Sequence, residues 1–323
     1  MHMNLLISKE VNTFRKDVLQ GLQSTSKHLE SKYFYDATGD QLFRDIMNCP
    51  EYYLTNCELE ILKTQTAQLA AAIKSSAEPF DLIELGAGDA SKSIYLLRYL
   101  LAQNHAFTYM PIDISGNVIA QLSNKLPALL PGLLINGLHG EYFEMLKKAT
   151  TLSSRRKVVL FLGSNIGNMP LTEATIFCKA LRSHLSIHDR LLIGADLKKD
   201  PKTILAAYND KAGITKQFNL NLLKRINREL QADFDCNQFD HYACYDPENG
   251  ACKSYLVSLQ NQQITIDGAA PISFHKDECI AMEISQKFTV KQLDQLALDT
   301  GFYPVNHFFD DKEWFMDSIW EAR

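Results

Sequence analysis

No apolar run in this chain of 323 residues reaches the roughly 18–20 residues that a membrane-spanning helix needs. The longest candidates, at 158–163 and 191–195, have the length of strands. The start of the chain lacks a basic segment followed by an apolar core, so no secretory signal is predicted. We therefore expect a cytoplasmic protein that has no membrane partner.

Paired cysteines and excess basic charge are missing as well. The seven cysteines are an odd number and form no C-x-x-C pair, which favours reduced thiols in a reducing compartment. His241, Cys244 and Cys252 lack a fourth ligand and a zinc-like spacing, so no metal site is predicted. The formal net charge of -5 at pH 7 is not typical of a dedicated nucleic-acid binder, and we expect no nucleic-acid partner.

What the chain does have is ordinary globular composition, with 46% hydrophobic and 22% charged residues. This composition excludes a disordered chain and a disulfide-stabilised miniprotein. Because single hydrophobic cores stop growing near roughly 250–300 residues, the length allows one large domain or two joined domains.

Short apolar segments follow one another through the first two thirds of the chain. They lie at 79–88, 107–115, 132–137, 157–164 and 190–197. Helical patterns separate several of them, at 91–101, 116–125 and 171–185. Strands that are buried on both faces are continuously apolar, as these segments are. The order therefore predicts an α/β fold with a doubly wound parallel sheet.

The pattern changes after residue 196. Residues 201–230 have helical patterns, and the segments 253–260, 264–268 and 278–288 have the pattern of antiparallel strands. A helix at 290–300 and an apolar strand at 301–308 are expected to return to the sheet, and 58–74 is predicted to be helical. We thus expect a core formed by 75–196 plus 286–323 and a second lobe formed by 1–74 plus 197–285.

A glycine turn follows the first strong strand. Gly86 and Gly88 lie between that strand and a helix, where glycine lets the backbone approach a ligand closely. Asp113, at the end of the next strand, is placed to hydrogen-bond ribose hydroxyls. Dinucleotides and S-adenosylmethionine both use such a turn, but a dinucleotide site favours a third glycine where this chain has Ser91. The cation of Lys92 instead suits the carboxylate of an amino-acid moiety.

Further motifs carry a more specific resemblance. They are KYFYD at 32–36, GDQLF at 39–43, PEYYLT at 50–55, FLGSNIGN at 161–168, DLKKD at 196–200, AYND at 207–210, FN at 218–219 and MEISQKF at 282–288. In this order the series resembles the histidine-specific, S-adenosylmethionine-dependent Nα-methyltransferases of ergothioneine biosynthesis. The resemblance implies a Rossmann-like class I methyltransferase core and a substrate-binding lobe made of the N-terminal helices and an α+β insertion.

The resemblance also implies a role for individual residues. The methyl donor would be held by Gly86, Gly88, Lys92, Asp113, Glu141 and Tyr142. The catalytic residues would be Tyr35 and Asn168. The amino-acid end of the substrate would be bound by Tyr52, Asn168 and Tyr208, and its imidazole ring by Glu283 and Ser285. Ser254 stands in the substrate pocket where the family commonly has a methionine.

The chain is therefore expected to methylate the α-amino group of L-histidine, towards N,N,N-trimethylhistidine. S-adenosylmethionine would be its cofactor, and a free amino acid would be its small-molecule partner. We expect the protein to be a monomer or a weak dimer. Because Ser254 would enlarge or wet the ring pocket, another amino acid or amine is an open alternative substrate. A non-catalytic protein that retains the fold is disfavoured by the intact glycine turn, Asp113 and Asn168, and a nicotinamide oxidoreductase by Ser91.

Overall fold

The chain forms two compact units. The computed structural model describes residues 2–74 and 78–323. The core unit comprises Leu54–Lys198 and Gln286–Arg323, and the lobe unit comprises Met1–Tyr53 and Lys199–Ser285. The expected boundary at residue 74 differs from this division, because residues 54–74 belong to the core unit. Their helices α3 (Leu54–Thr64) and α4 (Thr66–Ile73) pack against elements of that unit and bury apolar side chains there.

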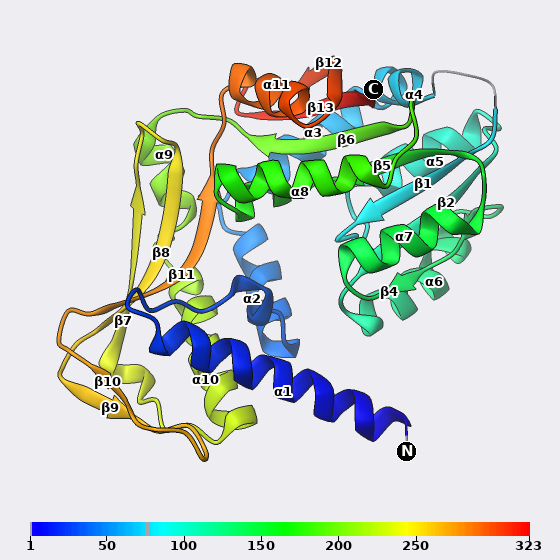
Figure 1. Ribbon diagram of the computed structural model, residues 1–323. Helices are drawn as coiled ribbons and strands as arrows, with labels where there is room; N and C mark the ends of the chain where they lie inside the picture. Colours follow the sequence, from blue (N-terminus) through cyan, green and yellow to red (C-terminus); the bar gives the residue numbers. More distant parts are fainter. Residues whose placement is uncertain (1, 75–77) are drawn as a thin grey trace. The chain divides into compact units, whose positions relative to one another are not determined.

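The core unit is built on an eight-stranded sheet (Figure 1). Its strands are β1 (Phe80–Leu85), β2 (Phe107–Asp113), β3 (Leu134–Ile135), β4 (Leu138–His139), β5 (Arg156–Phe161), β6 (Arg190–Asp196), β12 (Phe302–Phe309) and β13 (Phe315–Ala322). The spatial order is β12-β13-β6-β5-β1-β2-β3, and β4 also pairs with β2. The strands β1 to β6 pair in parallel, whereas β13 is antiparallel to both β6 and β12. The predicted doubly wound α/β sheet is confirmed.

Helices cover both faces of this sheet. Besides α3 and α4 they are α5 (Ile94–Ala102), α6 (Gly116–Leu129), α7 (Tyr142–Leu152), α8 (Leu171–Ser183) and α11 (Val290–Asp299), with the 3-10 turn η2 (Asn165–Asn168). In Figure 1, α7 and α8 lie in front of the sheet, and α3 and α5 lie behind it. Every residue of β1 is consequently buried, including Asp81 and Glu84, which are the two acids in an otherwise apolar strand.

Some expected elements differ in detail. The predicted helix at 58–74 is two helices that meet at Gln65, and the predicted helix at 91–101 begins only at Ile94. The predicted strand at 132–137 is reduced to the two residues of β3. The expected return of the C-terminal helix and strand to the sheet is confirmed. The sequence did not reveal β13, because Asp317 and Ser318 interrupt its apolar pattern although both are fully buried.

The lobe unit combines helices with two small sheets. Its elements are α1 (His2–Gln23), η1 (Ser31–Phe34), α2 (Ala37–Met47), α9 (Pro201–Ala207), α10 (Ile214–Leu230), η3 (Cys236–Gln238), β7 (Phe239–Tyr245), β8 (Ala251–Ser258), β9 (Gln262–Ile264), β10 (Ile272–Phe274) and β11 (Cys279–Gln286). One sheet has the order β11-β8-β7 and the other pairs β10 with β9. Leu222 of α10, Phe239 of β7 and Leu256 of β8 belong to one buried core. The predicted strand at 264–268 is wrong beyond Ile264, where β9 ends.

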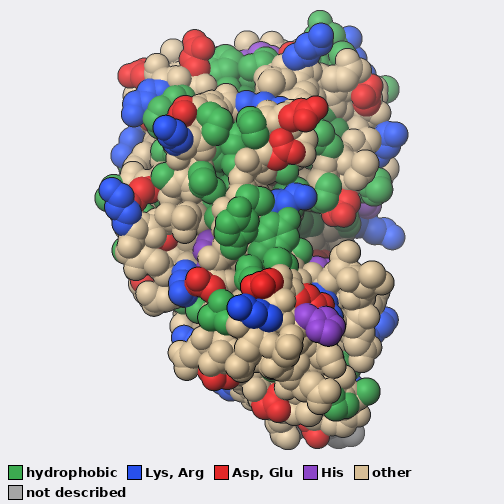
Figure 2. Space-filling model, turned by 90° about the vertical axis from the view of Figure 1, so that its left-hand side faces the viewer, with side chains coloured by type: hydrophobic (Ala, Val, Ile, Leu, Met, Phe, Trp, Pro, Cys, Tyr) green, Lys and Arg blue, Asp and Glu red, His purple; other side chains and the backbone are tan. Residues whose placement is uncertain are grey.

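The face shown in Figure 2 carries charge of both signs. Lysine and arginine side chains are interspersed there with aspartate and glutamate side chains, as the small net charge of -5 at pH 7 leads one to expect. Across residues 2–74 and 78–323, none of the helices combines the length and the apolar character that crossing a membrane requires.

Candidate functional site

The strand order of the core unit reverses between β1 and β5. Sheets of this kind bind ligands outside the carboxyl ends of their strands at such a point. A glycine turn follows each of the two strands, with Gly86 after β1 at φ 69° and Gly163 after β5 at φ 75°. Glycine adopts these left-handed conformations without strain. The two turns therefore form the floor of a candidate ligand site.

Side chains approach the Gly86 turn closely. A Cβ atom at Gly86 would lie 2.7 Å from the Tyr142 hydroxyl and 3.4 Å from Asn165 Nδ2. Tyr142 begins α7, and its ring packs on Phe161 with the ring centroids 6.0 Å apart. Burial raises the pKa of Tyr142 to about 12, so its hydroxyl stays protonated near neutral pH. The preceding residue, Glu141, is exposed and occupies the N-cap position of α7.

Asp113 lies beside the same turn, as the sequence predicted. The N–H of Gly88 donates to Asp113 Oδ2 at 3.1 Å, and the N–H of Ser115 donates to Oδ1 at 2.8 Å. A carboxylate has about four acceptor sites. Both oxygens therefore retain acceptor capacity for ligand hydroxyls while the carboxylate is held in a fixed orientation.

Lys92 has a partner that sequence reasoning missed. Its ammonium forms an ion pair with Glu58 of α3, whose side chain is fully buried. The other oxygen of Glu58 accepts a hydrogen bond of 2.6 Å from the N–H of Gly163. Burial acts to lower the pKa of Lys92, but the charge of Glu58 outweighs this effect and raises it. Glu58 belongs to an ordinary amphipathic pattern, so only the long-range fold identifies its partner.

Asn168 ends the turn that follows β5. Its Nδ2 donates to Asn165 Oδ1 at 3.3 Å, and the side chain is exposed. The preceding Gly167 packs so closely on the backbone that a Cβ would lie 2.8 Å from the carbonyl oxygen of Gln286. Asn168 is thus linked through Asn165 to the Gly86 turn, and it has a surface that a ligand can reach.

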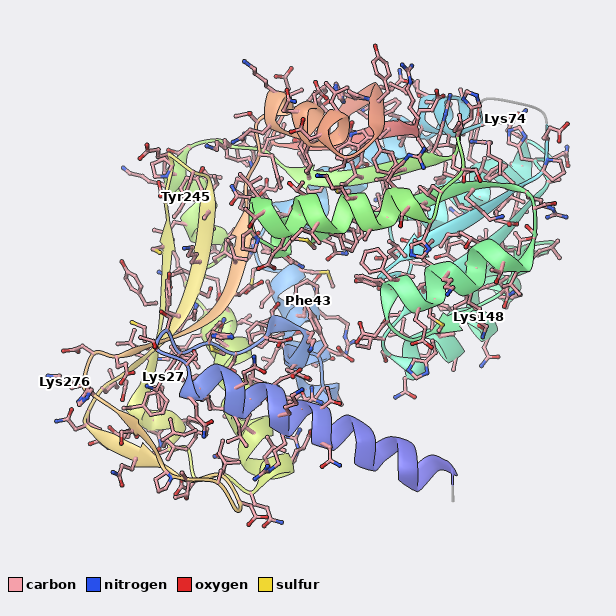
Figure 3. The ribbon with its side chains drawn as sticks, in the orientation of Figure 1. Lys27, Phe43, Lys74, Lys148, Tyr245 and Lys276 are labelled. Carbon is pink, nitrogen blue, oxygen red and sulfur yellow. The ribbon has the colours of Figure 1, made fainter. Side chains whose placement is uncertain are left out.

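The three tyrosines among the predicted acceptor residues belong to a cluster of aromatic rings in the lobe unit. Phe43 of α2, labelled in Figure 3, contacts Tyr35 and Tyr52, with centroid distances of 5.6 Å and 6.5 Å. The ring of Tyr52 in turn contacts that of Tyr208 at 6.2 Å. Phe218 of α10 lies 5.8 Å from Tyr35. Segments far apart in the sequence therefore meet, and Phe43 and Phe218 join the cluster although no role was predicted for them.

A buried polar contact continues this cluster. The hydroxyls of Tyr208 and Ser285 are 2.6 Å apart, and either of them can be the donor. Glu283, two residues before Ser285 on β11, is half-buried. Ser254 is buried on β8 and pairs with Ala243 of β7, so both side chains at this register are small.

Asp36 fixes the segment that carries Tyr35. Asp36 caps α2 by accepting the N–H of Gly39 at 2.7 Å, and it also accepts hydrogen bonds from Asn221 and Arg228 of α10. Burial acts to raise the pKa of Asp36, but these donors outweigh it and lower the pKa. Tyr35 itself is 43% exposed. Its reach into solvent is consistent with a contact to a ligand, and Asp36 holds its backbone in place.

A buried acid, Glu84, lies in β1 just before the glycine turn. The Tyr109 hydroxyl donates to Glu84 Oε2 at 2.5 Å. Burial raises the pKa of Glu84 to about 7, whereas an unfolded chain has a glutamate pKa of about 4.3. Between about pH 4.3 and about pH 7, the folded protein therefore keeps a proton on Glu84 that the unfolded chain has released.

We expect this proton to make stability depend on pH. The contribution of Glu84 to the free energy of unfolding is fully present below about pH 4.3 and is lost as the pH rises through about 7. Glu84→Gln keeps the shape and an acceptor but cannot ionise. Its free energy of unfolding relative to wild type should rise by on the order of 3 kcal/mol between about pH 4.5 and about pH 8. Urea titrations at several pH values measure this difference, and a constant difference would refute the assignment.

The predicted residues are distributed over both units. The core unit carries Gly86, Gly88, Lys92, Asp113, Glu141, Tyr142 and Asn168, and the lobe unit carries Tyr35, Tyr52, Tyr208, Ser254, Glu283 and Ser285. Within the core unit, Lys92, Asp113, Tyr142 and Asn168 lie at the turns after β1 and β5, and Glu141 is exposed at the start of α7. Within the lobe unit, Tyr35, Tyr52, Tyr208 and Ser285 meet in the aromatic cluster.

The amino-acid sequence was compared with protein families and with known proteins. Residues 14–322 match the profile of a family described as histidine-specific methyltransferase, SAM-dependent. A histidine N-alpha-methyltransferase of Mycobacterium tuberculosis is 33% identical, over 92% of this chain and 91% of that protein. A histidine N-alpha-methyltransferase of Mycolicibacterium smegmatis is 34% identical, over 95% of this chain and 94% of that protein. An L-tryptophan methyltransferase of Psilocybe serbica is 26% identical, over 92% and 90%.

Proposed function

Because the chain belongs to the histidine-specific, S-adenosylmethionine-dependent methyltransferase family, we propose that it methylates the α-amino group of L-histidine. The acceptor is then a small molecule. The observation that carries the proposal is the buried contact of 2.6 Å between the Tyr208 and Ser285 hydroxyls, beside a ring cluster and two residues from Glu283. Hydroxyl and carboxylate groups are the partners that an imidazole ring requires.

The core unit offers groups that fit each part of the donor. Asp113, beside the glycine turn, suits the ribose hydroxyls, and Lys92 suits the carboxylate of the methionine moiety. Glu141 and Tyr142, at the start of α7, are assigned to the adenine end. Gly86 and Gly88 leave the backbone open for close approach. When bound, S-adenosylmethionine supplies a sulfonium methyl group that is already strongly electrophilic.

The chain's own residues then have the tasks of binding and alignment. We assign the carboxylate and amine of the substrate to Tyr52, Asn168 and Tyr208, and the imidazole ring to Glu283 and Ser285. Tyr35 and Asn168 orient the amine for an in-line attack, and such positioning is worth many kcal/mol in displacement reactions. The attacking amine must be neutral, although the α-amine of a peptide, with a pKa of about 7.7–8.0, is mostly protonated at neutral pH. The α-amine of a free amino acid is more basic still. Tyrosine and asparagine side chains favour the neutral amine because they add no negative charge beside it.

A second candidate substrate is another amino acid with a larger side chain. Ser254, 2% exposed, and its cross-strand partner Ala243 both have small side chains, so this part of β7 and β8 supplies little side-chain volume of its own. A relative that covers most of this chain is named an L-tryptophan methyltransferase. The polar pair Tyr208–Ser285 favours histidine over that alternative, since an imidazole offers two ring nitrogens as hydrogen-bonding groups and an indole offers a single N–H donor.

Glu283→Ala tests the assignment of the ring. Wild type should methylate histidine with a higher kcat/KM than leucine or phenylalanine. Loss of the carboxylate should erode this preference by about 1.5–3 kcal/mol, the usual contribution of a hydrogen bond to a charged group. The measurement is kcat/KM for the three amino acids with both proteins, followed by mass spectrometry of the methylated products.

Glu278→Ala is the matched control, because Glu278 precedes the same strand and forms an ion pair with Lys27 at 2.5 Å. It should leave the preference for histidine unchanged. Equal kcat/KM values for the three amino acids with wild type would refute the histidine assignment and leave the wider methyltransferase activity standing.

A further inference from the structure

Four ionisable side chains share a buried site in the core unit. Glu58 comes from α3, Glu84 from β1, Lys92 from the turn before α5, and Asp317 from β13. Glu58 and Asp317 are 0% exposed, Glu84 is 4% exposed, and the side chain of Lys92 is 22% exposed. Electrostatic interactions link Lys92 to all three acids. One cation therefore faces three carboxyl groups, and the cluster would carry excess negative charge if all were ionised.

The geometry places two of these acids next to each other. Gly194 of β6 pairs with Asp317 of β13. A Cβ atom at Gly194 would overlap the Glu58 carboxylate and would lie 3.0 Å from Asp317 Oδ1. Glycine at 194 therefore makes room for both carboxyl groups. Glu58 is fully engaged by Lys92 and the Gly163 N–H, whereas neither buried oxygen of Asp317 has a hydrogen-bond partner among the described residues.

Charge balance then distinguishes the roles of the acids. An ionised carboxylate that is buried without a partner is very costly, and such a group takes up a proton instead. Burial, together with the negative charge of Glu58, raises the pKa of Asp317 well above its usual range. Burial likewise raises the pKa of Glu84 to about 7. With Asp317 protonated, Glu58 is the anion that pairs with Lys92.

We propose that Glu58 and Asp317 are positioning residues for the methyl donor: Glu58 anchors the Lys92 ammonium, and Asp317 stays neutral beside it, so that Glu58 is the acid that carries the negative charge facing Lys92. This inference rests on the proposed role of Lys92 in binding the donor carboxylate. A Cβ at Gly163 would lie 3.4 Å from Lys92 Nζ, so the anchored ammonium is held beside the turn after β5. Glu58 and Asp317 are too deeply buried to contact the ligand themselves.

The anchor matters because a lysine side chain is flexible. A lysine side chain has many rotamers, and a ligand that has to order a loose ammonium binds more weakly. Burial without Glu58 would also favour the neutral amine of Lys92, which cannot pair with a carboxylate. Loss of Glu58 should therefore weaken only those ligands that carry the amino-acid moiety.

Calorimetry with two ligands tests this expectation. S-adenosylhomocysteine carries the amino-acid moiety, and 5′-methylthioadenosine shares the adenosine and the sulfur but lacks it. Wild type should bind the first more tightly. Glu58→Gln should weaken S-adenosylhomocysteine by about tenfold, the size of a lost charged contact, while 5′-methylthioadenosine stays within about twofold. Equal weakening of both ligands would overturn the proposal, as would tighter binding of S-adenosylhomocysteine.

Two variants at Asp317 test its neutral state. Asp317→Ala removes the group beside Glu58 and should weaken S-adenosylhomocysteine several-fold. Asp317→Asn has nearly the same shape, can donate a hydrogen bond and cannot ionise, so it should recover most of the affinity that the alanine variant loses. An asparagine variant that binds as weakly as the alanine variant would refute a neutral Asp317.

Asp81→Asn is the matched control, because Asp81 of β1 forms a buried ion pair with Lys157 of β5 at 2.9 Å, near the start of both strands. It should lower the melting temperature without changing the ratio of the two affinities. If Glu58→Gln does not fold by circular dichroism, Glu58→Asp, which shortens the anchor and keeps its charge, should show the same selective loss. If the wild-type protein binds S-adenosylhomocysteine and 5′-methylthioadenosine with equal affinity, the proposed role of Lys92 itself is refuted, rather than that of Glu58.

Discussion

Replacing Asn168 with alanine should lower kcat by about a hundredfold or more, the scale seen when one oriented hydrogen-bonding group is removed from an active site. Asn168 is exposed at the carboxyl edge of the sheet, and its amide is oriented by Asn165 at 3.3 Å. We assign this amide to the reacting end of the substrate. Its loss should therefore impair alignment of the amine while the affinity for S-adenosylhomocysteine and the melting temperature stay nearly unchanged.

The test combines steady-state kinetics, calorimetry and thermal unfolding for the same variant. Asn306→Ala, a change at an exposed asparagine on β12 of the same unit, is the control and should leave all three measurements unchanged. A variant at Asn168 that unfolds readily but is fully active in its folded fraction would make this residue structural.

Asp113→Ala should weaken S-adenosylhomocysteine by about 1.5–3 kcal/mol, which is roughly 10- to 150-fold in the dissociation constant. The carboxylate holds the turn through the Gly88 N–H at 3.1 Å and presents its remaining lone pairs to the ligand. Both contributions are lost in the alanine variant. Asp113→Asn retains one acceptor oxygen and should bind with intermediate affinity.

Calorimetry on the wild type and the two Asp113 variants measures this effect. Asp299→Ala removes a carboxylate on α11 that accepts a hydrogen bond of 2.8 Å from Gln295, one turn earlier in the same helix, and it serves as the control. Unchanged affinity in Asp113→Ala would show that the ribose lies elsewhere and would contradict the placement of the donor at the turn after β1.

The parts of the candidate site that depend on short stretches of sequence could be predicted. Gly86, Gly88 and Asp113 were expected to lie together because a strand, a tight turn and a helix impose that geometry over few residues. The hydrogen bond from Gly88 to Asp113 bears this out. The presence of a parallel sheet followed in the same way from apolar, regularly spaced segments, whereas the spatial order of its strands is known only from the structure.

Long-range packing produced the features that the sequence did not reveal. Glu58 was assigned to an ordinary helix face, and its contacts with Lys92 and Gly163 exist only because α3 packs against the core sheet. Asp317 lies in a strand whose polar residues hid it from any search for apolar runs. Periodicity reports which face of an element is buried, but it does not report which distant element covers that face.

The acceptor site shows the same limit. The motif series suggested that Tyr52, Tyr208 and Ser285 act together, and the structure brings these three side chains into contact. Phe43 and Phe218 were visible in the same motifs, yet aromatic residues are common in cores. Only their ring contacts indicate a place in the cluster: Phe43 contacts Tyr35 and Tyr52, and Phe218 contacts Tyr35 and Phe43.

The central claim, methylation of the α-amino group of histidine, is tested most directly by a competition experiment. The protein is incubated with S-adenosylmethionine and an equimolar mixture of the standard amino acids, and the methylated products are identified by mass spectrometry with fragmentation. The account predicts that histidine methylated on its α-amino nitrogen is the dominant product. A dominant product from another amino acid, methylation on the imidazole ring, or no methylated product at all would contradict it.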